Sequence, residues 1–212
     1  MNIKIFVFNP FYENTIVLSS QKKNCFIFDP GCYERFEFDE LNNYIEAEGL
    51  KVKAIINTHC HIDHVLGNHF LKNRYGVPLK IPVNEKEIYD AVPEYAPQWG
   101  IRNYSHTEVD KYLKEGAELA LDEVSFELTE VPGHSPGHLM YYNKDEEVVI
   151  GGDVLFRDSI GRTDLPGGNQ EVLLRNIREK VYTLPDEVTV YPGHGTQTTI
   201  GYEKRNNPFV KA

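Results

Sequence analysis

The segment Thr58-His59-Cys60-His61-Ile62-Asp63-His64 is the most informative part of this sequence. It places three imidazoles and one carboxylate within six residues, directly after an apolar run. Side chains two residues apart point the same way in an extended segment, so His59 and His61 can share one metal ion. Asp63 and His64 begin a predicted helix and can turn toward a second ion. Imidazole and carboxylate donors suit zinc, iron or manganese, whereas a sulfur-dominated site would need thiolates.

Three further candidate ligands lie far from this segment in the chain. His134, Asp153 and His194 each follow a predicted strand and stand beside glycine, which lets backbone and ion approach closely. We expect these strand ends to open on one edge of the fold and to complete a two-metal site. Burying so many ionisable groups without compensation would be costly, so the alternative that they are ordinary loop residues is disfavoured.

Hydrophobic periodicity predicts two halves, each with strands followed by helix. In the first half we expect strands at 3–8, 15–20, 25–28 and 52–57, and helices at 36–48, 66–75 and 85–91, the last capped by Asn84. In the second half we expect strands at 117–121, 124–131, 139–143, 147–151 and 188–191, and a helix at 170–182. Two such halves indicate one α/β domain over residues 1–212, a four-layer αββα sandwich with sheets inside and helices outside.

A lid or insertion is predicted around residues 84–115. Its middle, residues 92–107, contains two prolines and the aromatic residues Tyr95, Trp99 and Tyr104 without clear periodicity. These aromatic side chains either contact substrate or pack the loop onto the body of the protein.

Composition excludes several classes of protein. A chain of 212 residues with 41% hydrophobic, 12% aromatic and 25% charged residues is typical of one globular domain, not of a disordered or fibrous protein. The formal net charge of -10 would repel polyphosphate, so we expect no nucleic-acid partner. The sequence predicts no particular oligomeric state.

The N-terminal segment and the cysteines indicate the cellular compartment of the protein. Only four consecutive apolar residues, 5–8, precede Asn9 and Pro10, which is too short for a signal peptide or a membrane span. The three cysteines are odd in number and lack the spacing of a disulfide framework, as expected for a protein in a reducing compartment. We therefore expect a cytoplasmic protein that does not bind membranes.

The remaining candidate residues are assigned supporting roles. The thiol of Cys60 is a further candidate metal ligand, but we expect it to point away from the neighbouring histidines; structural roles are favoured for His69, His106 and His138. Three polar residues near the motifs are candidates for orienting the ligands, namely Asp29, Thr58 and Ser135. For Asp29, an ordinary role in the turn Asp29-Pro30-Gly31 is an equal alternative.

These motifs resemble those of the metallo-β-lactamase superfamily. The shared features are THxHxDH at 58–64, PGHSPGH at 132–138, GGD at 151–153 and PGHG at 192–195, in that order across nearly the whole chain. The resemblance implies that the first metal is held by His59, His61 and His134, the second by Asp63, His64 and His194, and both by Asp153.

Within the superfamily, residues 151–168 and 198–209 look like the short bacterial type of glyoxalase II, a hydroxyacylglutathione hydrolase. This resemblance implies hydrolysis of S-lactoylglutathione or a related small acyl-thiol. True β-lactamases are less similar, because they are exported and lack the metal-bridging aspartate. The sequence differs from long-form glyoxalase II enzymes at two places that bear on the substrate. Those enzymes have a basic C-terminal extension where this chain ends. They also have a tyrosine at the position of Thr196. Arg162 matches a lysine that contacts glutathione, or alternatively forms a salt bridge with Asp158 or Asp164.

The predicted mechanism uses two divalent ions, most simply zinc, with iron or manganese as alternatives, and a hydroxide that bridges them. Asp63 would orient this nucleophile and accept its proton, and no side-chain nucleophile is required.

Three rival functions remain at the level of sequence. Persulfide dioxygenases resemble the same family, share a GRTD-like segment and use one iron, which His61 or His59 would hold here with His134 and Asp153. The complete second ligand set favours two metals. An RNA-processing nuclease is disfavoured by the acidic net charge, and a noncatalytic metal-binding protein by the complete set of ligands.

Overall fold

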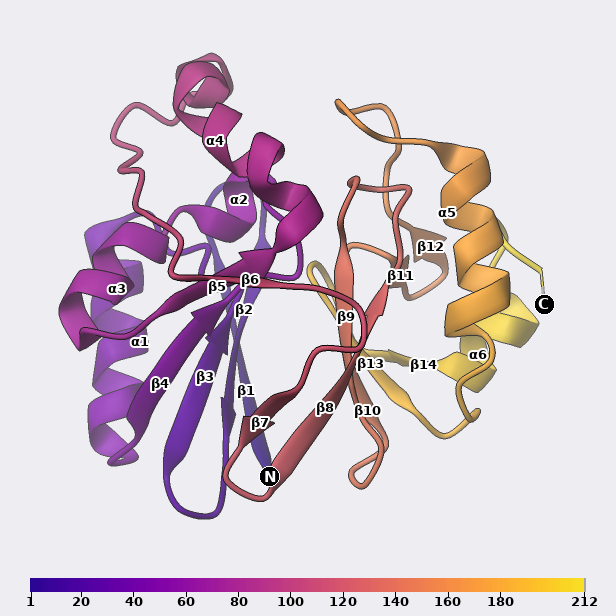
Figure 1. The fold of residues 1–212 in the computed structure, drawn as a ribbon, viewed down its shortest axis with the longest axis horizontal. Coiled ribbons are helices and arrows are strands. Elements are labelled where there is room, and N and C mark those ends of the chain that lie inside the picture. Colours follow the sequence, from indigo (N-terminus) through magenta and orange to yellow (C-terminus); the bar gives the residue numbers. More distant parts are fainter. Residues whose placement is uncertain (212) are drawn as a thin grey trace. The chain divides into compact units, whose positions relative to one another are not determined.

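The computed structural model describes residues 1–211, and the chain divides into two compact units. Unit 1 comprises Met1–Leu113 with Ala120–Val124, and unit 2 comprises Lys114–Leu119 with Ser125–Ala212. Each unit contains a β-sheet and helices (Figure 1). The predicted α/β class is therefore confirmed.

The sheet of unit 1 has six strands in the order β1-β2-β3-β4-β5-β6. They are β1 (Asn2–Phe8), β2 (Glu13–Ser19), β3 (Asn24–Phe28), β4 (Lys51–Ile56), β5 (Leu79–Pro82) and β6 (Lys111–Leu113). Strands β1 to β3 pair antiparallel, whereas β3 to β6 pair parallel. Parallel neighbours need crossover connections, and helices supply them here. These helices are α1 (Arg35–Ala47), α2 (Ile62–Val65), α3 (Asn68–Tyr75) and α4 (Lys86–Tyr95), with 3₁₀ turns η1 (Val83–Glu85) and η2 (Ala96–Trp99).

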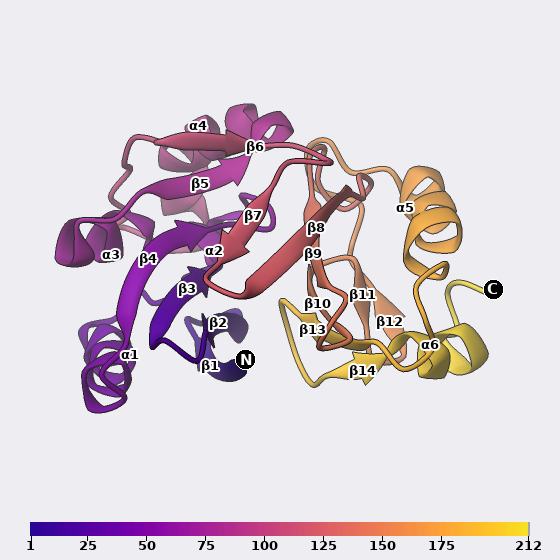
Figure 2. The ribbon, with the colours of Figure 1, turned by 60° about the horizontal axis from the view of Figure 1, so that its bottom comes forward.

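The core of unit 1 lies between its sheet and the helices α1 and α3. Leu41 of α1 and Leu71 of α3 belong to one buried cluster with Ile27, Ile55 and Leu79 of the strands. In both ribbon views α1 and α3 lie beside the parallel part of the sheet (Figures 1 and 2). Burial of these strand residues fixes which face of the sheet packs against the helices, and the parallel pairing of β3 with β4 places their carboxyl ends at the same edge of the sheet.

Two predicted helices of unit 1 differ from the structure at their ends. The helix expected at 66–75 is split into α2 and α3, because the chain turns at Leu66 and Gly67. The helix expected to end at 91 continues to Tyr95 through Pro93, and the N-cap position of α4 is Glu85 rather than Asn84. Burial of Tyr89 and Val92 accounts for the extension, since packing overrides the helix-breaking tendency of one proline in the last turn.

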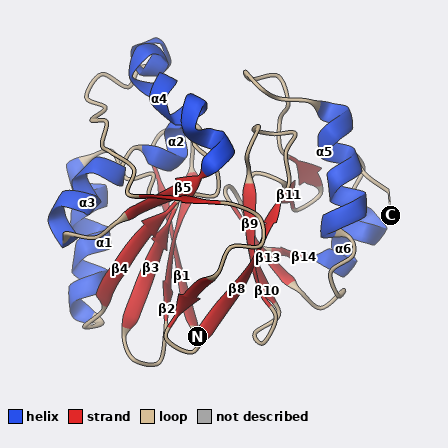
Figure 3. Cartoon of the chain, viewed as in Figure 1, coloured by secondary structure: helices blue, strands red, loops and turns tan. Residues whose placement is uncertain are grey.

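The expected lid contains more regular structure than its sequence suggests. Residues 84–115 contain α4, η2 and β6, and β6 pairs parallel with β5. Residues 100–110 contain neither helix nor strand, and they form the long loop before β6 (Figure 3).

The second six-stranded sheet, most of whose residues belong to unit 2, has the strand order β14-β13-β10-β9-β8-β7. Its strands are β7 (Leu119–Leu121), β8 (Val124–Glu130), β9 (Leu139–Asn143), β10 (Val148–Gly152), β13 (Thr189–Pro192) and β14 (Thr198–Thr199). A separate two-stranded hairpin consists of β11 (Leu155–Phe156) and β12 (Ser159–Ile160). The helices are α5 (Gln170–Asn176), which continues as the π-helical turn η3 (Ile177–Val181), and α6 (Ile200–Asn206).

The core of unit 2 forms between its sheet and the α5 segment. Leu173, Ile177 and Val181 pack in a buried cluster with Val149 of β10 and Val190 of β13. The segment 170–182, predicted to be helical, therefore packs against the sheet through Leu173, Ile177 and Val181. Among the helices of residues 1–211, none combines the length and apolar character that crossing a membrane would require.

Candidate metal centre

In unit 1 the shared direction of two parallel strands brings Asp29 and Thr58 together. Asp29 follows β3 and Thr58 follows β4, and the backbone N–H of Asp29 donates to the carbonyl of Ile56 at 2.9 Å. Asp29 adopts a left-handed φ of 45°, a conformation that aspartate tolerates better than most residues. Its carboxylate accepts the backbone N–H of Thr58 through Oδ1 at 2.6 Å and the Thr58 hydroxyl through Oδ2 at 2.6 Å.

This pair also orients the first histidine of the motif. The Oγ1 atom of Thr58 lies 3.0 Å from Nδ1 of His59. Because the Thr58 hydroxyl already donates to Asp29, its oxygen accepts from His59, so Nδ1 carries the proton and the Nε2 lone pair can serve a metal. Asp29 also lies beside His64, with Oδ2 at 3.3 Å from its Nδ1. The expected orienting roles of Asp29 and Thr58 match these contacts.

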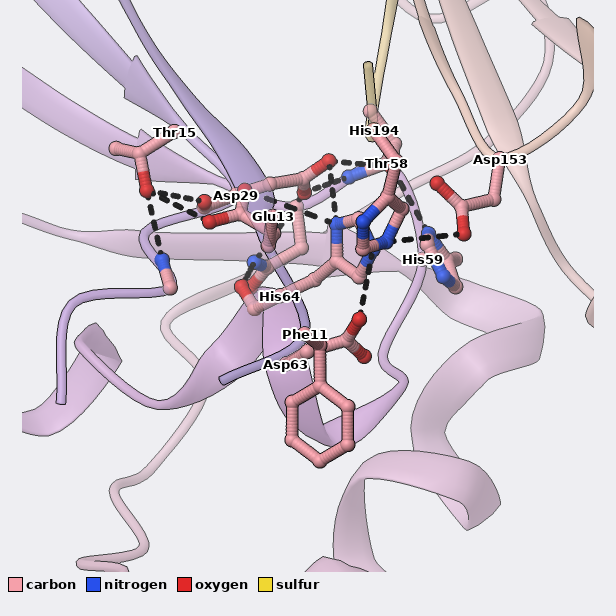
Figure 4. A network of polar contacts seen from close by, with 12 residues as sticks. Phe11, Glu13, Thr15, Asp29, Thr58, His59, Asp63, His64, Asp153 and His194 are labelled. Carbon is pink, nitrogen blue, oxygen red and sulfur yellow. Dashed lines mark hydrogen bonds and ion pairs between the residues drawn. The ribbon is translucent and has the colours of Figure 1, made fainter. Parts of the chain in front are cut away.

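The histidines of the motif are close together inside unit 1. The ring of His59 lies 4.8 Å from that of His61 and 4.1 Å from that of His64. All three are buried, and Oδ2 of Asp63 lies 3.7 Å from Nε2 of His64. Figure 4 shows His59, Asp63 and His64 with Asp29 and Thr58 beside them. Buried, mutually close imidazoles and carboxylates fit a divalent metal, which would compensate their desolvation.

In unit 2 the three remaining candidate ligands also come together. Asp153 follows β10 and His194 follows the parallel strand β13, where Gly152 is in register with Pro192. Oδ2 of Asp153 lies 3.6 Å from Nε2 of His134 and 3.5 Å from Nε2 of His194. One carboxylate oxygen thus faces two imidazole nitrogens, an arrangement suited to an aspartate shared between metal ions.

The backbone around these ligands fixes their orientation. Nδ1 of His134 lies 2.7 Å from the carbonyl oxygen of Arg162. A carbonyl only accepts, so Nδ1 is the protonated nitrogen and Nε2 is the ligand atom. Gly161 leaves the space that this contact needs, since a Cβ there would lie 2.0 Å from the carbonyl oxygen of Asp153 and 3.0 Å from Nδ1 of His134.

The second histidine of the PGHSPGH segment has the structural role predicted for it. His138 is wholly buried, and its Nε2 accepts the backbone N–H of Asp153 at 3.0 Å. His138 therefore holds the start of the segment that carries the aspartate. Ser135, the third candidate orienting residue, is also wholly buried.

Three residues that were not assigned as metal ligands, Cys60, His69 and His106, have positions that fit structural roles. Cys60 is a member of the unit 1 core, and burial raises the pKa of its thiol well above the usual value. His69 contacts the side chain of Asn73 at 3.0 Å, and His106 lies 4.0 Å from Asp90. The expectation that Cys60 points away from its neighbours agrees with its place in the apolar core.

The guanidinium of Arg162 forms a salt bridge with Asp164. Such a salt bridge was the predicted alternative to a contact with glutathione. Nε and one terminal nitrogen of Arg162 bond the two carboxylate oxygens of Asp164, both at 2.7 Å. These hydrogen bonds lower the pKa of Asp164 to about 2. Asp158, the other proposed partner, accepts instead from the hydroxyl of Tyr202 at 3.0 Å.

Several buried polar residues around the motif were not identified from sequence. Glu13 of β2 is wholly buried beside His64, with Oε1 at 3.9 Å from its Nδ1, and burial raises the pKa of Glu13 well above the usual value. Glu85 is wholly buried and accepts the backbone N–H of Cys60 at 2.9 Å. A glutamate at the start of an apolar strand is the signal that points to Glu13, whereas no local pattern points to Glu85.

Known proteins are similar to this chain over most of its length. Residues 8–194 match the family model described as "Metallo-beta-lactamase superfamily". Hydroxyacylglutathione hydrolase GloC of Haemophilus influenzae is 39% identical, and the match covers 100% of this chain and 99% of that protein.

Two solved structures are also similar over nearly the whole chain. The BLEG-1 B3 metallo-beta-lactamase superposes with a TM-score of 0.91 and 34% identity, and the match covers 100% of both chains. TTHA1623, crystallised in a di-iron-bound form, superposes with a TM-score of 0.86 and 32% identity, and the match covers 98% of this chain and 100% of the other.

Proposed function

Because this chain belongs to the metallo-β-lactamase superfamily, we propose that it is a binuclear metal-dependent hydrolase of thioesters such as S-lactoylglutathione or a related acyl-thiol. Membership of the family supports a hydrolase that uses divalent metal ions. The similarity to hydroxyacylglutathione hydrolase GloC supports a small acyl-thiol as substrate. We also propose that residues 1–212 act as one catalytic domain with residues 84–115 as its lid.

The proposed ligands are those that the sequence analysis assigned. His59, His61 and His134 would hold one ion, Asp63, His64 and His194 the other, and Asp153 both. The observation that carries this assignment is the position of Asp153, whose Oδ2 lies within 3.6 Å of both His134 and His194. Those two histidines belong to different ligand sets, so a shared carboxylate between them favours two ions over one.

Zinc is the proposed metal, and the di-iron form of TTHA1623 makes iron the principal alternative. Such ions, when bound, would lower the pKa of a coordinated water toward neutrality and polarise the thioester carbonyl. In this proposal Asp63 orients the attacking water and accepts its proton. The contacts of Thr58 with His59 and of the Arg162 carbonyl with His134 keep each Nδ1 protonated, which reserves each Nε2 for a metal.

Arg162 is the proposed contact for the thiol carrier. Its side chain is 53% exposed, and its guanidinium is engaged with Asp164, which is 67% exposed. Ion pairs between exposed side chains contribute little to stability because water screens them, so a carboxylate on the substrate can displace Asp164 at little cost.

The decisive experiment combines elemental analysis with a thioester assay. Natively expressed protein should contain two equivalents of metal and hydrolyse S-lactoylglutathione without oxygen uptake. One iron per chain with oxygen consumption on a persulfide would instead establish the dioxygenase alternative.

Two substitutions test the proposed ligands. Asp63→Ala and Asp153→Ala should abolish thioester hydrolysis while far-UV circular dichroism stays unchanged, because each removes a proposed metal ligand. Asp145→Ala, at an exposed position between β9 and β10, is the matched control and should retain full activity. Full activity in either ligand variant, with its metal content verified, would contradict the assignment.

A further inference from the structure

The helix that contains Asp63 and His64 stops after four residues. The helix α2 spans Ile62–Val65, and a continuing helix would use the N–H of Gly67 to bond the carbonyl of Asp63. Instead this N–H donates to the carbonyl of Pro30 at 2.7 Å. Gly67 allows the close approach, since a Cβ there would lie 2.5 Å from Sγ of Cys32 and 2.9 Å from the Pro30 oxygen. The carbonyl of Asp63 therefore needs a donor from outside the helix.

The side chain of Asn9 supplies that donor. Its Nδ2 atom donates to the carbonyls of Asp63 and of Gly31, both at 3.0 Å. Its Oδ1 accepts the backbone N–H of Phe11 at 2.9 Å, so both the amide nitrogen and the amide oxygen are engaged. Asn9 is 8% exposed and has a left-handed φ of 53°, a conformation in which asparagine is enriched.

A second buried asparagine bonds the next carbonyl along the chain. Nδ2 of Asn57 donates to the carbonyl of His64 at 2.8 Å, and its Oδ1 accepts from Nδ2 of Asn68 at 2.9 Å. Both Asn57 and Asn68 are wholly buried. The peptide carbonyls of two successive proposed ligands are thus bonded by side-chain amides from other segments of unit 1.

The packing around Asn9 leaves little room for movement. A Cβ at Gly31 would lie 2.6 Å from Nδ2 of Asn9, 2.6 Å from the carbonyl oxygen of Asp63 and 2.0 Å from Oε2 of Glu13. The turn after β3, the turn after β1 and the start of α2 are therefore in direct contact at this point. Loss of the Asn9 amide would release Asp63 from this contact.

We propose that Asn9 and Asn57 are positioning residues, which hold the Asp63 and His64 carbonyls and thereby aim the two side chains at their metal ion. The inference rests on the proposed function for the role of that metal. Neither asparagine touches the substrate in this proposal. Removing a residue that orients a metal ligand typically weakens metal affinity or activity about 10- to 100-fold.

The test uses Asn9→Gly, Asn9→Asp and Asn57→Asp in the full chain. Glycine keeps the left-handed backbone of Asn9, and aspartate keeps the acceptor but replaces the donor nitrogen with oxygen. The affinity for Zn²⁺ is measured by competition with a chromophoric chelator, and kcat and KM are measured on S-lactoylglutathione. We expect the weaker of the two Zn²⁺ equivalents to lose about 10- to 100-fold in affinity and kcat to fall with KM unchanged.

Asn143→Asp is the matched control. Asn143 is also buried, its Nδ2 donates to the carbonyl of Ser125 at 2.7 Å and its Oδ1 accepts the N–H of Glu146 at 2.8 Å. It ends β9, whereas the ligand-bearing turn precedes that strand. This variant should lose stability but keep wild-type Zn²⁺ affinity and kcat.

The outcomes separate this inference from the proposed function. If folded Asn9 and Asn57 variants bind Zn²⁺ as tightly as the wild type, or if Asn143→Asp weakens binding equally, the inference is wrong. If the wild-type protein binds two Zn²⁺ but does not hydrolyse thioesters, the proposed function fails, and the Zn²⁺ affinities still decide the positioning role. Should Asn9→Asp not fold, Asn9→Gly and Asn57→Asp decide it.

Discussion

At the scale of single residues, Thr58 connects a carboxylate to an imidazole. Its hydroxyl donates to Asp29 at 2.6 Å and its oxygen lies 3.0 Å from Nδ1 of His59. The chain Asp29, Thr58, His59 is wholly or almost wholly buried, so its hydrogen bonds are shielded from water. A buried hydroxyl in this position sets the tautomer of the histidine as well as its orientation.

Replacing Thr58 with valine tests this role. Thr58→Val keeps the shape of the side chain but leaves Nδ1 of His59 and the Asp29 carboxylate without their shared partner. We expect Zn²⁺ affinity to fall about 10- to 100-fold, measured by chelator competition. Thr58→Ser, which keeps the hydroxyl, should stay near the wild-type value. Equal affinities for the valine and serine variants would show that the hydroxyl does not orient His59.

At the scale of elements, the buried carboxylate of Glu203 ties α6 to its neighbours in unit 2. It accepts the hydroxyl of Thr198 at 2.5 Å, the backbone N–H of Asp158 at 3.1 Å and the side-chain amide of Asn207 at 2.8 Å. Asn207 in turn donates to the carbonyl of Ser159 at 3.0 Å. The small hairpin β11–β12 is therefore held to α6 by polar contacts.

Glu203→Ala should destabilise the protein through this network. The substitution leaves three donors without their acceptor, and the two buried ones, on Thr198 and Asn207, each cost about 1–3 kcal/mol when unsatisfied. We expect the free energy of unfolding in urea to fall by roughly 2–4 kcal/mol and Glu203→Gln to lose less, since it keeps one acceptor oxygen. Glu187→Ala, at an exposed position, is the control and should change it by less than about 0.5 kcal/mol. A loss no larger than that of the control would contradict the role of Glu203.

At the scale of the whole molecule, the free thiols lie inside the core of unit 1. The chain contains three cysteines, all buried. Burial raises the pKa of the Cys25 thiol to about 12, and burial is also the main cause of the raised pKa values of Cys32 and Cys60. In the folded protein these groups are therefore protonated thiols, which react poorly with electrophiles.

The raised thiol pKa values predict both reactivity and pH dependence. Native protein at pH 8 should resist labelling by a thiol reagent, and three thiols should react in urea. An unfolded thiol ionises near pH 8.5, so above that pH the unfolded chain releases protons that the folded protein retains. The contribution of the Cys25 thiol to the free energy of unfolding should therefore be fully present below about pH 8.5. It should be lost as the pH rises toward the pKa of this thiol in the folded protein, about 12.

Cys25→Ala is the variant that isolates this effect. It should show a shallower loss of unfolding free energy between pH 8 and 10 than the wild type does, as measured by urea titration. Rapid labelling of the native protein, or an identical pH dependence in the variant, would mean that the thiols are not held in the core as described.

Local sequence patterns predicted most of the long elements. The strands β1 to β4 and β8 to β10, the helix α1 and the α5 segment all lie within a few residues of their expected bounds. The short strands β5, β6, β11, β12 and β14 and the helix α6 were not predicted. A strand of two to four residues has too few side chains to show periodicity and forms only because a neighbouring strand is available to pair with it.

The sequence by itself determined which side chains are suited to bind metal and that the motif residues follow a strand, because donor chemistry and hydrophobic periodicity are local properties. The seven proposed ligands and the orienting residues Asp29 and Thr58 were found in this way. Only the tertiary structure identified Asn9 and Glu85, because hydrogen-bond partners depend on chain topology. Asn9 bonds a carbonyl 54 residues away in the chain, and no local pattern encodes which distant carbonyl a helix leaves unsatisfied.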